Sequence, residues 1–279
     1  MTGRVHTSEV TTRLHADQSG WVCIVIPAYN EAATIGDIVH RCRAALDFPC
    51  MIIVVDDGSR DRTGAIAAQS GATVLRHAEN QGKGASLMNG MRVAFAEGAA
   101  CVVSLDGDGQ HRPEDIPRLL ACGQNWPRHV VIGSRRASGR TAPRARFIAN
   151  RVADFWVSWA ARHPIDDSQS GFRVYPAELV GLISARPAFA RGFAFESEML
   201  IEAARLGFHT ASVDIPTIYG SVLQRPSHFR PIADITWIVL LVAGKLLAWG
   251  MDPVGLWRSL TLPRLCDNSR PLGTTPCRR

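Results

Sequence analysis

Several features that would place a chain in other protein classes are missing from these 279 residues. The seven cysteines form no CxxC pair, and Cys23 and Cys101 lie inside apolar, strand-like runs. Neither a disulfide framework nor a zinc site is therefore indicated, and a reducing cytosol fits best. The first twenty residues hold no apolar core of a signal peptide, so we expect no secretion signal and no N-terminal anchor.

The chain also lacks a run long enough to span a bilayer. Its longest apolar stretch, residues 235–251, is shorter than the ~20 residues that a spanning helix needs, and Lys245 interrupts it. The formal net charge is +6, but the basic residues are scattered, and no module alternates aromatic and basic residues. Nucleic acid is therefore not an expected partner, whereas a membrane surface or a phosphorylated substrate would suit the charge.

What the chain does contain is an alternation of short β-branched runs with segments of helical spacing. The strand-like runs lie at 21–26, 51–55, 72–76, 100–105 and 129–133. This alternation predicts an α/β fold with a Rossmann-like, doubly wound, mostly parallel sheet flanked by helices. With 46% apolar residues and no low-complexity break, we expect one globular domain over 21–230, with disordered tails at 1–20 and 252–279.

Residues 231–251 are expected to form a hydrophobic helix that lies at a membrane interface. The side chains in and around it that suit an interfacial helix are Trp237, Trp249, Trp257, Arg230, Lys245 and Arg258. A helix packed on the domain's own core would look similar, so both interpretations stay open. The membrane hypothesis places the protein peripherally, on the cytoplasmic face of the inner membrane.

Polar residues follow four successive strands of the predicted sheet. These strand ends are PAYNE at 27–31, DDGS at 56–59, DGDGQH at 106–111 and GSRR at 133–136. In an open parallel sheet, ligands bind beyond the carboxyl ends of the strands. Aspartate and glycine are ordinary turn residues after any one strand, but four such ends on one rim indicate a binding site.

Asp106 and Asp108 follow the fourth strand with one residue between them. Two carboxylates so spaced can turn toward one divalent cation, and their hard oxygen atoms suit Mg²⁺ or Mn²⁺ better than zinc. Gln110 can add a neutral oxygen. Because magnesium usually takes one or two carboxylates and further ligands from substrate phosphates, a diphosphate-bearing ligand is expected.

Other kinds of phosphate site do not match the sequence. The segment HAENQGKGAS has His77 where a P-loop has its first glycine, and Gly84 where serine or threonine should follow Lys83. No GxGxxG follows the first strand, so dinucleotide redox chemistry is not expected either. Lys83, beside two glycines at a predicted helix start, can still contact a phosphate.

Six segments, in this order and spacing, resemble the motifs of the family 2 glycosyltransferases of GT-A fold: VIPAYNE, VVDDGSRDRT, NQGKGAS, SLDGDGQHRPEDIPRLL, IGSRR and DSQSGFRVYP. The similarity runs over residues 21–250 and is greatest to the polyprenyl-phosphate, or dolichyl-phosphate mannose synthase-like, branch. The resemblance implies metal-dependent, inverting transfer of a sugar from a nucleotide-diphospho-sugar to a lipid acceptor, with a polyprenyl phosphate expected.

The same resemblance assigns residues to roles. The donor is expected to meet Pro27, Tyr29, Glu31, Asp56, Asp57, Lys83, Asp106, Gly107 and Arg135. The metal is expected to meet Asp106, Asp108 and Gln110. Catalytic roles are expected for Asp108 and for two arginines that would meet donor or acceptor phosphates, Arg146 and Arg173. The segment that closes over the site contains Ser227, His228 and Arg230, and Gly107 stands where alanine is usual.

Two questions stay open at this point: which acceptor is used, and whether the chain is catalytically active. A lipid phosphate is already an anion and needs no general base, whereas a hydroxyl of a lipid or glycan needs one. The candidate bases are Asp167, Glu196, Glu198 and His228. A non-catalytic, membrane-bound scaffold of the same fold would be expected to have damaged metal ligands, and here both aspartates of the DGD motif are intact.

Overall fold

The computed structural model describes residues 21–135, 144–184, 194–216 and 231–266. The predicted N-terminal tail lies outside these residues, as does the segment that contains Ser227, His228 and Arg230.

A seven-stranded sheet runs through the described residues in the order β3-β2-β1-β4-β6-β5-β7. Its strands are β1 (Val22–Ala28), β2 (Cys50–Asp56), β3 (Thr73–Arg76), β4 (Cys101–Ser104), β5 (His129–Ser134), β6 (Arg173–Pro176) and β7 (His209–Asp214). Strand β6 lies between β4 and β5 and is antiparallel to both, and the other pairings are parallel. The predicted mostly parallel α/β sheet is confirmed.

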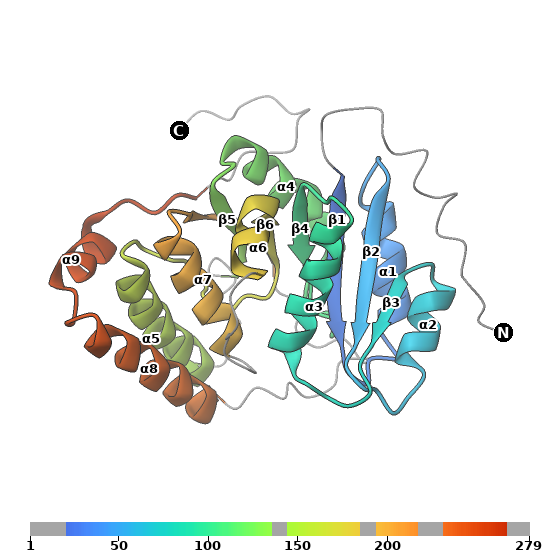
Figure 1. Ribbon diagram of the computed structural model, residues 1–279, viewed down its shortest axis with the longest axis horizontal. Coiled ribbons are helices and arrows are strands. Elements are labelled where there is room, and N and C mark those ends of the chain that lie inside the picture. The colour runs from blue at the N-terminus through green and yellow to red at the C-terminus, as the bar shows by residue number, and fades with distance from the viewer. Residues whose placement is uncertain (1–20, 136–143, 185–193, 217–230, 267–279) are drawn as a thin grey trace.

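Strands β1 and β2 are almost entirely apolar, as expected where helices cover both faces of a sheet. In β1, Cys23 and Val25 belong to one buried cluster, and Ile24 and Ile26 belong to the other. The helices along this half of the chain are α1 (Ile35–Ala44), α2 (Thr63–Gln69), α3 (Lys83–Ala96), the short 3-10 helix η2 (Pro113–Asp115), α4 (Ile116–Asn125) and α6 (Ala177–Ser184). In Figure 1, α1 and α3 lie on opposite sides of β1 and β2.

Four further helices extend one side of the molecule beyond the sheet: α5 (Arg144–Ala161), α7 (Phe195–Arg205), α8 (Pro231–Ala248) and α9 (Pro253–Thr261). Helix α8 corresponds to the hydrophobic helix of the sequence, and it packs on α5. Its buried residues belong to the same core cluster as those of α5 and α7: Ile235, Ile238, Val242 and Leu246. One face of α8 is therefore part of the domain core.

Lys245, which was expected to suit a membrane interface, forms ion pairs within the domain. Its Nζ lies 2.8 Å from Oε1 of Glu198 and 3.2 Å from Oε1 of Glu202, both on α7. The charge that interrupts the apolar run is thus paired across the α7–α8 contact. None of the helices in the described ranges is long and apolar enough to cross a membrane.

The expectation of a disordered tail from residue 252 onward is wrong for its first part. Asp252 caps α9, because its Oδ1 accepts the N–H of Gly255 at 3.0 Å, and Pro253 occupies the first turn. Trp159 on α5 also donates its indole N–H to the Asp252 carbonyl at 3.0 Å. Composition pointed to disorder, whereas the Asp-Pro pair is a helix start; residues 267–279 lie outside the described residues.

Asp154 on α5 faces the loop that leads into β6. Its Oδ1 accepts the N–H of Ser168 at 2.8 Å. Burial, and then the neighbouring Asp167 carboxylate, raise the pKa of Asp154 to about 6. In the folded state Asp154 therefore holds its proton below a pH of about 6, whereas in the unfolded chain it holds the proton only below pH ~4. Ionised Asp154 thus costs stability above that window, and the cost disappears as the pH falls.

We expect Asp154→Asn to raise the free energy of unfolding by about 1–3 kcal/mol near pH ~8 and by progressively less near pH ~5. The amide keeps the acceptor for Ser168 but removes the charge. Urea denaturation of both proteins at several pH values measures the difference. A stability difference that does not change with pH would contradict the assignment.

Candidate active site

The carboxyl ends of β1, β2 and β4 meet at one edge of the sheet, since these strands pair in parallel. Side chains of the turn after β2 hold the turn after β1. The N–H of Asn30 donates to Ser59 Oγ at 2.9 Å, and the N–H of Glu31 donates to Thr63 Oγ1 at 2.8 Å. The segments after β1 and β2, which are the first two polar strand ends predicted from the sequence, are therefore hydrogen-bonded to each other.

Asp56 and Asp57, which end and follow β2, have different partners. Asp56 is fully buried, and its Oδ1 accepts the N–H of Ser59 at 2.9 Å. Asp57 accepts the N–H groups of Gln81 and Gly82, both at 2.8 Å, and lies 2.7 Å from Nδ1 of His77. The Asp57 carboxylate thus holds the turn that precedes α3.

The DGD turn after β4 stacks on the turn after β1. Thr34 Oγ1 donates to the Gly107 carbonyl at 2.7 Å. A Cβ added at Gly107 would lie 3.1 Å from the Pro27 carbonyl oxygen and 3.6 Å from Cγ of Glu31. The structure therefore brings Pro27, Glu31 and Gly107 together, and it explains why a side chain at 107 must be small. Tyr29, in the same turn after β1, is half-buried.

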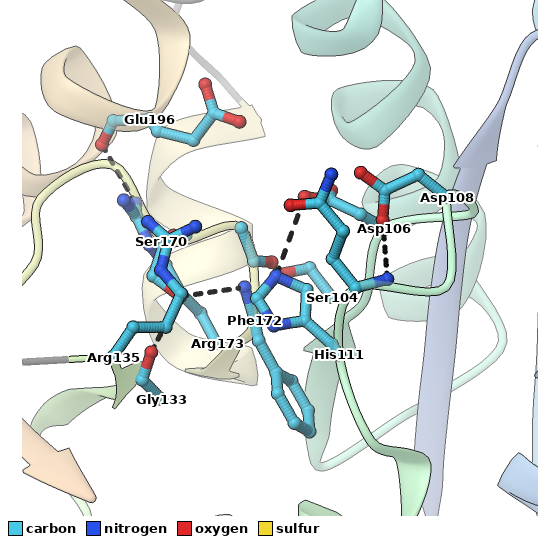
Figure 2. Close-up of polar contacts among 12 residues, drawn as sticks. Ser104, Asp106, Asp108, His111, Gly133, Arg135, Ser170, Phe172, Arg173 and Glu196 are labelled. Carbon is cyan, nitrogen blue, oxygen red and sulfur yellow. Dashed lines mark hydrogen bonds and ion pairs between the residues drawn. The ribbon is translucent and has the colours of Figure 1, made fainter. Parts of the chain in front are cut away.

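The two carboxylates of the DGD turn lie in contrasting surroundings (Figure 2). Asp106 Oδ1 lies 2.7 Å from Lys83 Nζ, and its Oδ2 lies 3.7 Å from His111 Nε2. Burial alone would raise the pKa of Asp106, but the Lys83 ammonium and His111 hold it well below its usual range. Asp108 Oδ1 accepts the N–H of Gln110 at 3.0 Å, and burial and then the Asp106 carboxylate raise its pKa.

These residues fit a divalent cation. The donors are carboxylate oxygens, which Mg²⁺ and Mn²⁺ prefer. The pKa of Asp108 is raised first by burial and then by repulsion from the Asp106 carboxylate, and a cation would relieve that repulsion. No three histidine, cysteine or acidic side chains in the described part of the chain form a ready-made metal cage. A cation here would take its other ligands from Gln110, water or substrate.

Sequence reasoning assigned no role to His111 or Gly171. His111 is buried beside the Phe172 ring, with 5.4 Å between the two ring centroids. A Cβ at Gly171 would lie 2.7 Å from both carboxylate oxygens of Asp106 and 2.8 Å from Lys83 Nζ. The position of His111 directly after the acidic motif was the available signal for the first, and nothing in the sequence alone indicated the second.

Arg173 is placed differently from the expectation that it meets a phosphate. Its side chain is fully buried and donates to three backbone carbonyls, those of Ser170 at 2.8 Å, Ser168 at 2.7 Å and Glu196 at 2.8 Å. Its Nη1 also lies 3.3 Å from the Tyr175 hydroxyl. Arg173 therefore ties the loop before β6 to the start of α7.

The other predicted site residues either form ion pairs or have side chains outside the described residues. Arg135, after β5, forms a two-pronged ion pair with Asp167, with nitrogen–oxygen distances of 2.8 Å for both prongs. This guanidinium lowers the pKa of Asp167, although burial acts in the opposite direction. Glu196 Oε1 lies 2.7 Å from Lys83 Nζ. Arg146 belongs to α5, but its side chain lies outside the described residues.

Comparison with known proteins gives a consistent picture. A family model described as glycosyl transferase family 2 matches residues 23–170. The polyprenol monophosphomannose synthase of Mycolicibacterium smegmatis is 30% identical over 69% of this chain and 75% of its own length. The undecaprenyl-phosphate mannosyltransferase of Micrococcus luteus is 30% identical over 70% of this chain and 82% of its own.

Among solved structures, the fold is similar to glucosyl-3-phosphoglycerate synthase from Mycobacterium tuberculosis, crystallised with Mn²⁺, UDP and glucosyl-3-phosphoglycerate. That structure has a TM-score of 0.58 and 25% identity, and the match covers 82% of this chain and 79% of that one. The expected GT-A fold is thereby confirmed.

We expect Arg173→Met to lower the free energy of unfolding by about 3–5 kcal/mol, because three buried carbonyls lose a charged donor. Arg112→Met is the matched control: its half-exposed guanidinium lies 3.9 Å from Glu114, and the loss should stay below about 1 kcal/mol. Urea denaturation measures both variants. Equal, small losses would show that Arg173 does not brace the loop.

Proposed function

The chain belongs to glycosyl transferase family 2, and on that premise we propose that it moves a sugar from a nucleotide-diphospho-sugar to the phosphate of a polyprenyl lipid. The observation that carries the proposal is the half-buried acidic pair of Asp106 and Asp108 at the edge where β1, β2 and β4 end. Relatives named for transfer to polyprenol and undecaprenyl phosphate support the choice of acceptor.

The donor is proposed to lie across these strand ends. Pro27, Tyr29, Glu31 and Asp56 surround the nucleoside side, and a Mg²⁺ or Mn²⁺ ion held by Asp106, Asp108 and Gln110 would stabilise the charge that develops on the leaving diphosphate. A structural relative solved with Mn²⁺ and UDP supports this use of a metal. Lys83, at the same place, supplies an ammonium within reach of phosphate oxygens.

The partners of the three candidate bases that lie among the described residues favour an acceptor that is already an anion. Asp167 is paired with Arg135, Glu196 with Lys83, and Glu198 with Lys245. A carboxylate engaged by a cation is a weaker base, so these three residues are poorly suited to take a proton from a hydroxyl. A lipid phosphate requires no such step, and its attack in a single displacement would invert the anomeric carbon.

A membrane surface is the proposed location of the acceptor. Helices α8 and α9 both contact α5, and Figure 1 shows the three at the end of the molecule away from α2 and β3. We call their exposed large side chains the apolar face: Phe147, Ile148, Val152, Phe155, Trp237, Leu240, Leu247, Val254, Trp257 and Leu260.

Charge on the three helices suits anionic lipid. Arg151 and Arg258 are exposed, and among the side chains described on α5, α8 and α9 the one acid, Asp154, faces Ser168. Tryptophan and arginine beside aliphatic residues are what a surface at the lipid interface uses. Peripheral attachment at the cytoplasmic face of the inner membrane is the proposed arrangement.

The test of function is transfer of label from a panel of radiolabelled UDP- and GDP-sugars to undecaprenyl phosphate, with and without Mn²⁺. We expect metal-dependent label in the organic phase. Asp108→Asn should lower transfer by about 100-fold or more, because a carboxylate that stabilises the metal is lost. Its melting temperature without metal should not fall, because the change also relieves the repulsion with Asp106.

The other outcomes of this assay are equally informative. Full activity of Asp108→Asn would contradict the metal assignment. Donor hydrolysis without lipid label would indicate a hydroxyl acceptor and a catalytic base. Label on added 3-phosphoglycerate instead of the lipid would favour an acceptor of the kind named for the structural relative.

The apolar face is tested by Trp237→Ser with Trp257→Ser, whose side chains are 68% and 64% exposed. We expect binding to vesicles that contain anionic phospholipid to weaken by about tenfold or more, with an unchanged melting temperature. Phe48→Ser, an exposed residue between α1 and β2, is the matched control and should bind like the unaltered protein. Equal sedimentation of all three proteins would contradict the proposed surface.

A further inference from the structure

One ammonium group, that of Lys83, joins three separate elements at the candidate active site. Lys83 is the first residue of α3, Asp106 follows β4, and Glu196 belongs to the first turn of α7. Its Nζ lies 2.7 Å from Asp106 Oδ1 and 2.7 Å from Glu196 Oε1. Burial alone would lower the pKa of Lys83, but the two carboxylates raise it well above its usual range, so the group stays charged.

The surrounding backbone restricts where this ammonium can go. Gly171 lies so close that a Cβ there would be 2.8 Å from Lys83 Nζ and 2.7 Å from both Asp106 oxygens. Gly171 is itself held to β4, because Ser104 Oγ donates to its carbonyl at 2.7 Å. On the other side, Arg173 donates to the Glu196 carbonyl at 2.8 Å. The Asp106 carboxylate therefore has no room to withdraw toward Gly171, and the backbone of Glu196 is fixed by Arg173.

Lys83 and a divalent cation compete for Asp106. Magnesium ligands lie at about 2.0–2.1 Å, and a dication on Asp106 would repel an ammonium that lies 2.7 Å from the same carboxylate, which weakens the Lys83–Asp106 pair. Glu196 offers a second position. Its Oε2 is buried and has no hydrogen-bond partner among the described residues, so this carboxylate can accept more from Lys83 than it does now. In Figure 2, Glu196 lies across from Asp106 and Asp108.

We propose that Glu196 is a positioning residue that retains Lys83 when a divalent cation takes Asp106, so that the ammonium turns to the donor diphosphate instead of leaving the site. Without nucleotide, Lys83 occupies the cation position on Asp106; with metal and donor, it moves onto Glu196. The inference rests on the proposed function, since it concerns the metal and diphosphate of that reaction.

The test measures Mn²⁺ affinity of the full chain without nucleotide, by electron paramagnetic resonance of free Mn²⁺, and UDP affinity with Mn²⁺, by calorimetry. Lys83→Met should bind Mn²⁺ about tenfold more tightly, because the competing ammonium is gone, and should bind UDP about tenfold more weakly. Lys83→Gln serves as a second variant that keeps a neutral donor between the two carboxylates.

Glu196→Gln should weaken Mn²⁺ binding by about tenfold, since Lys83 then pairs with Asp106 alone. In the Lys83→Met background the same change should have little effect, and this separates retention of Lys83 from a general loss of negative charge. Glu198→Gln is the matched control on the same helix, because Glu198 pairs with Lys245 on α8, and it should leave both affinities unchanged.

Two results would overturn the inference: unchanged or weaker Mn²⁺ binding by both Lys83 variants, or an equal effect of Glu196→Gln in both backgrounds. Either result leaves the proposed function standing if the unaltered protein still binds Mn²⁺ with UDP and transfers sugar. Failure of the unaltered protein to bind Mn²⁺ even with UDP would overturn both the metal assignment and this inference.

Discussion

The buried guanidinium of Arg173 is the interaction on which the site geometry depends. It sits at the start of β6, the antiparallel strand inserted between β4 and β5, and it donates to carbonyls of the preceding loop and of α7. A buried cation is tolerated there because its guanidinium donates to three carbonyls and contacts the Tyr175 hydroxyl. Through it, Gly171 and Glu196 are held against the DGD turn, although they come from distant parts of the chain.

The acidic side chains at this edge of the sheet differ in their ion pairs and in their pKa values. Lys83 and His111 keep Asp106 ionised, while Asp108 lies beside it with a raised pKa. Arg135 similarly engages Asp167. Under the proposed function, Lys83 is the cation among these that would meet the donor diphosphate, and an ion held by Asp106 and Asp108 would balance more of its charge.

Ion pairs made by α7 connect the apolar face to the candidate active site. Lys245 ties α8 to α7, and Lys83 ties α7, through Glu196, to the end of β4. A helix proposed to lie on lipid is thereby connected to the proposed metal site through a small number of partly buried ion pairs. The helices proposed to lie on lipid and the proposed metal site thus belong to elements that share one core.

The sequence by itself predicted β1 to β5, a mostly parallel sheet and the acids at the strand ends, because hydrophobic period and turn chemistry depend on near neighbours. Only the tertiary structure decided that β6 is antiparallel, that Arg173 braces the loop instead of meeting phosphate, and that α9 is ordered. It also decided the partner of Lys83, since Glu196 lies more than a hundred residues further along the chain. Contacts between such distant residues depend on packing, which local patterns do not encode.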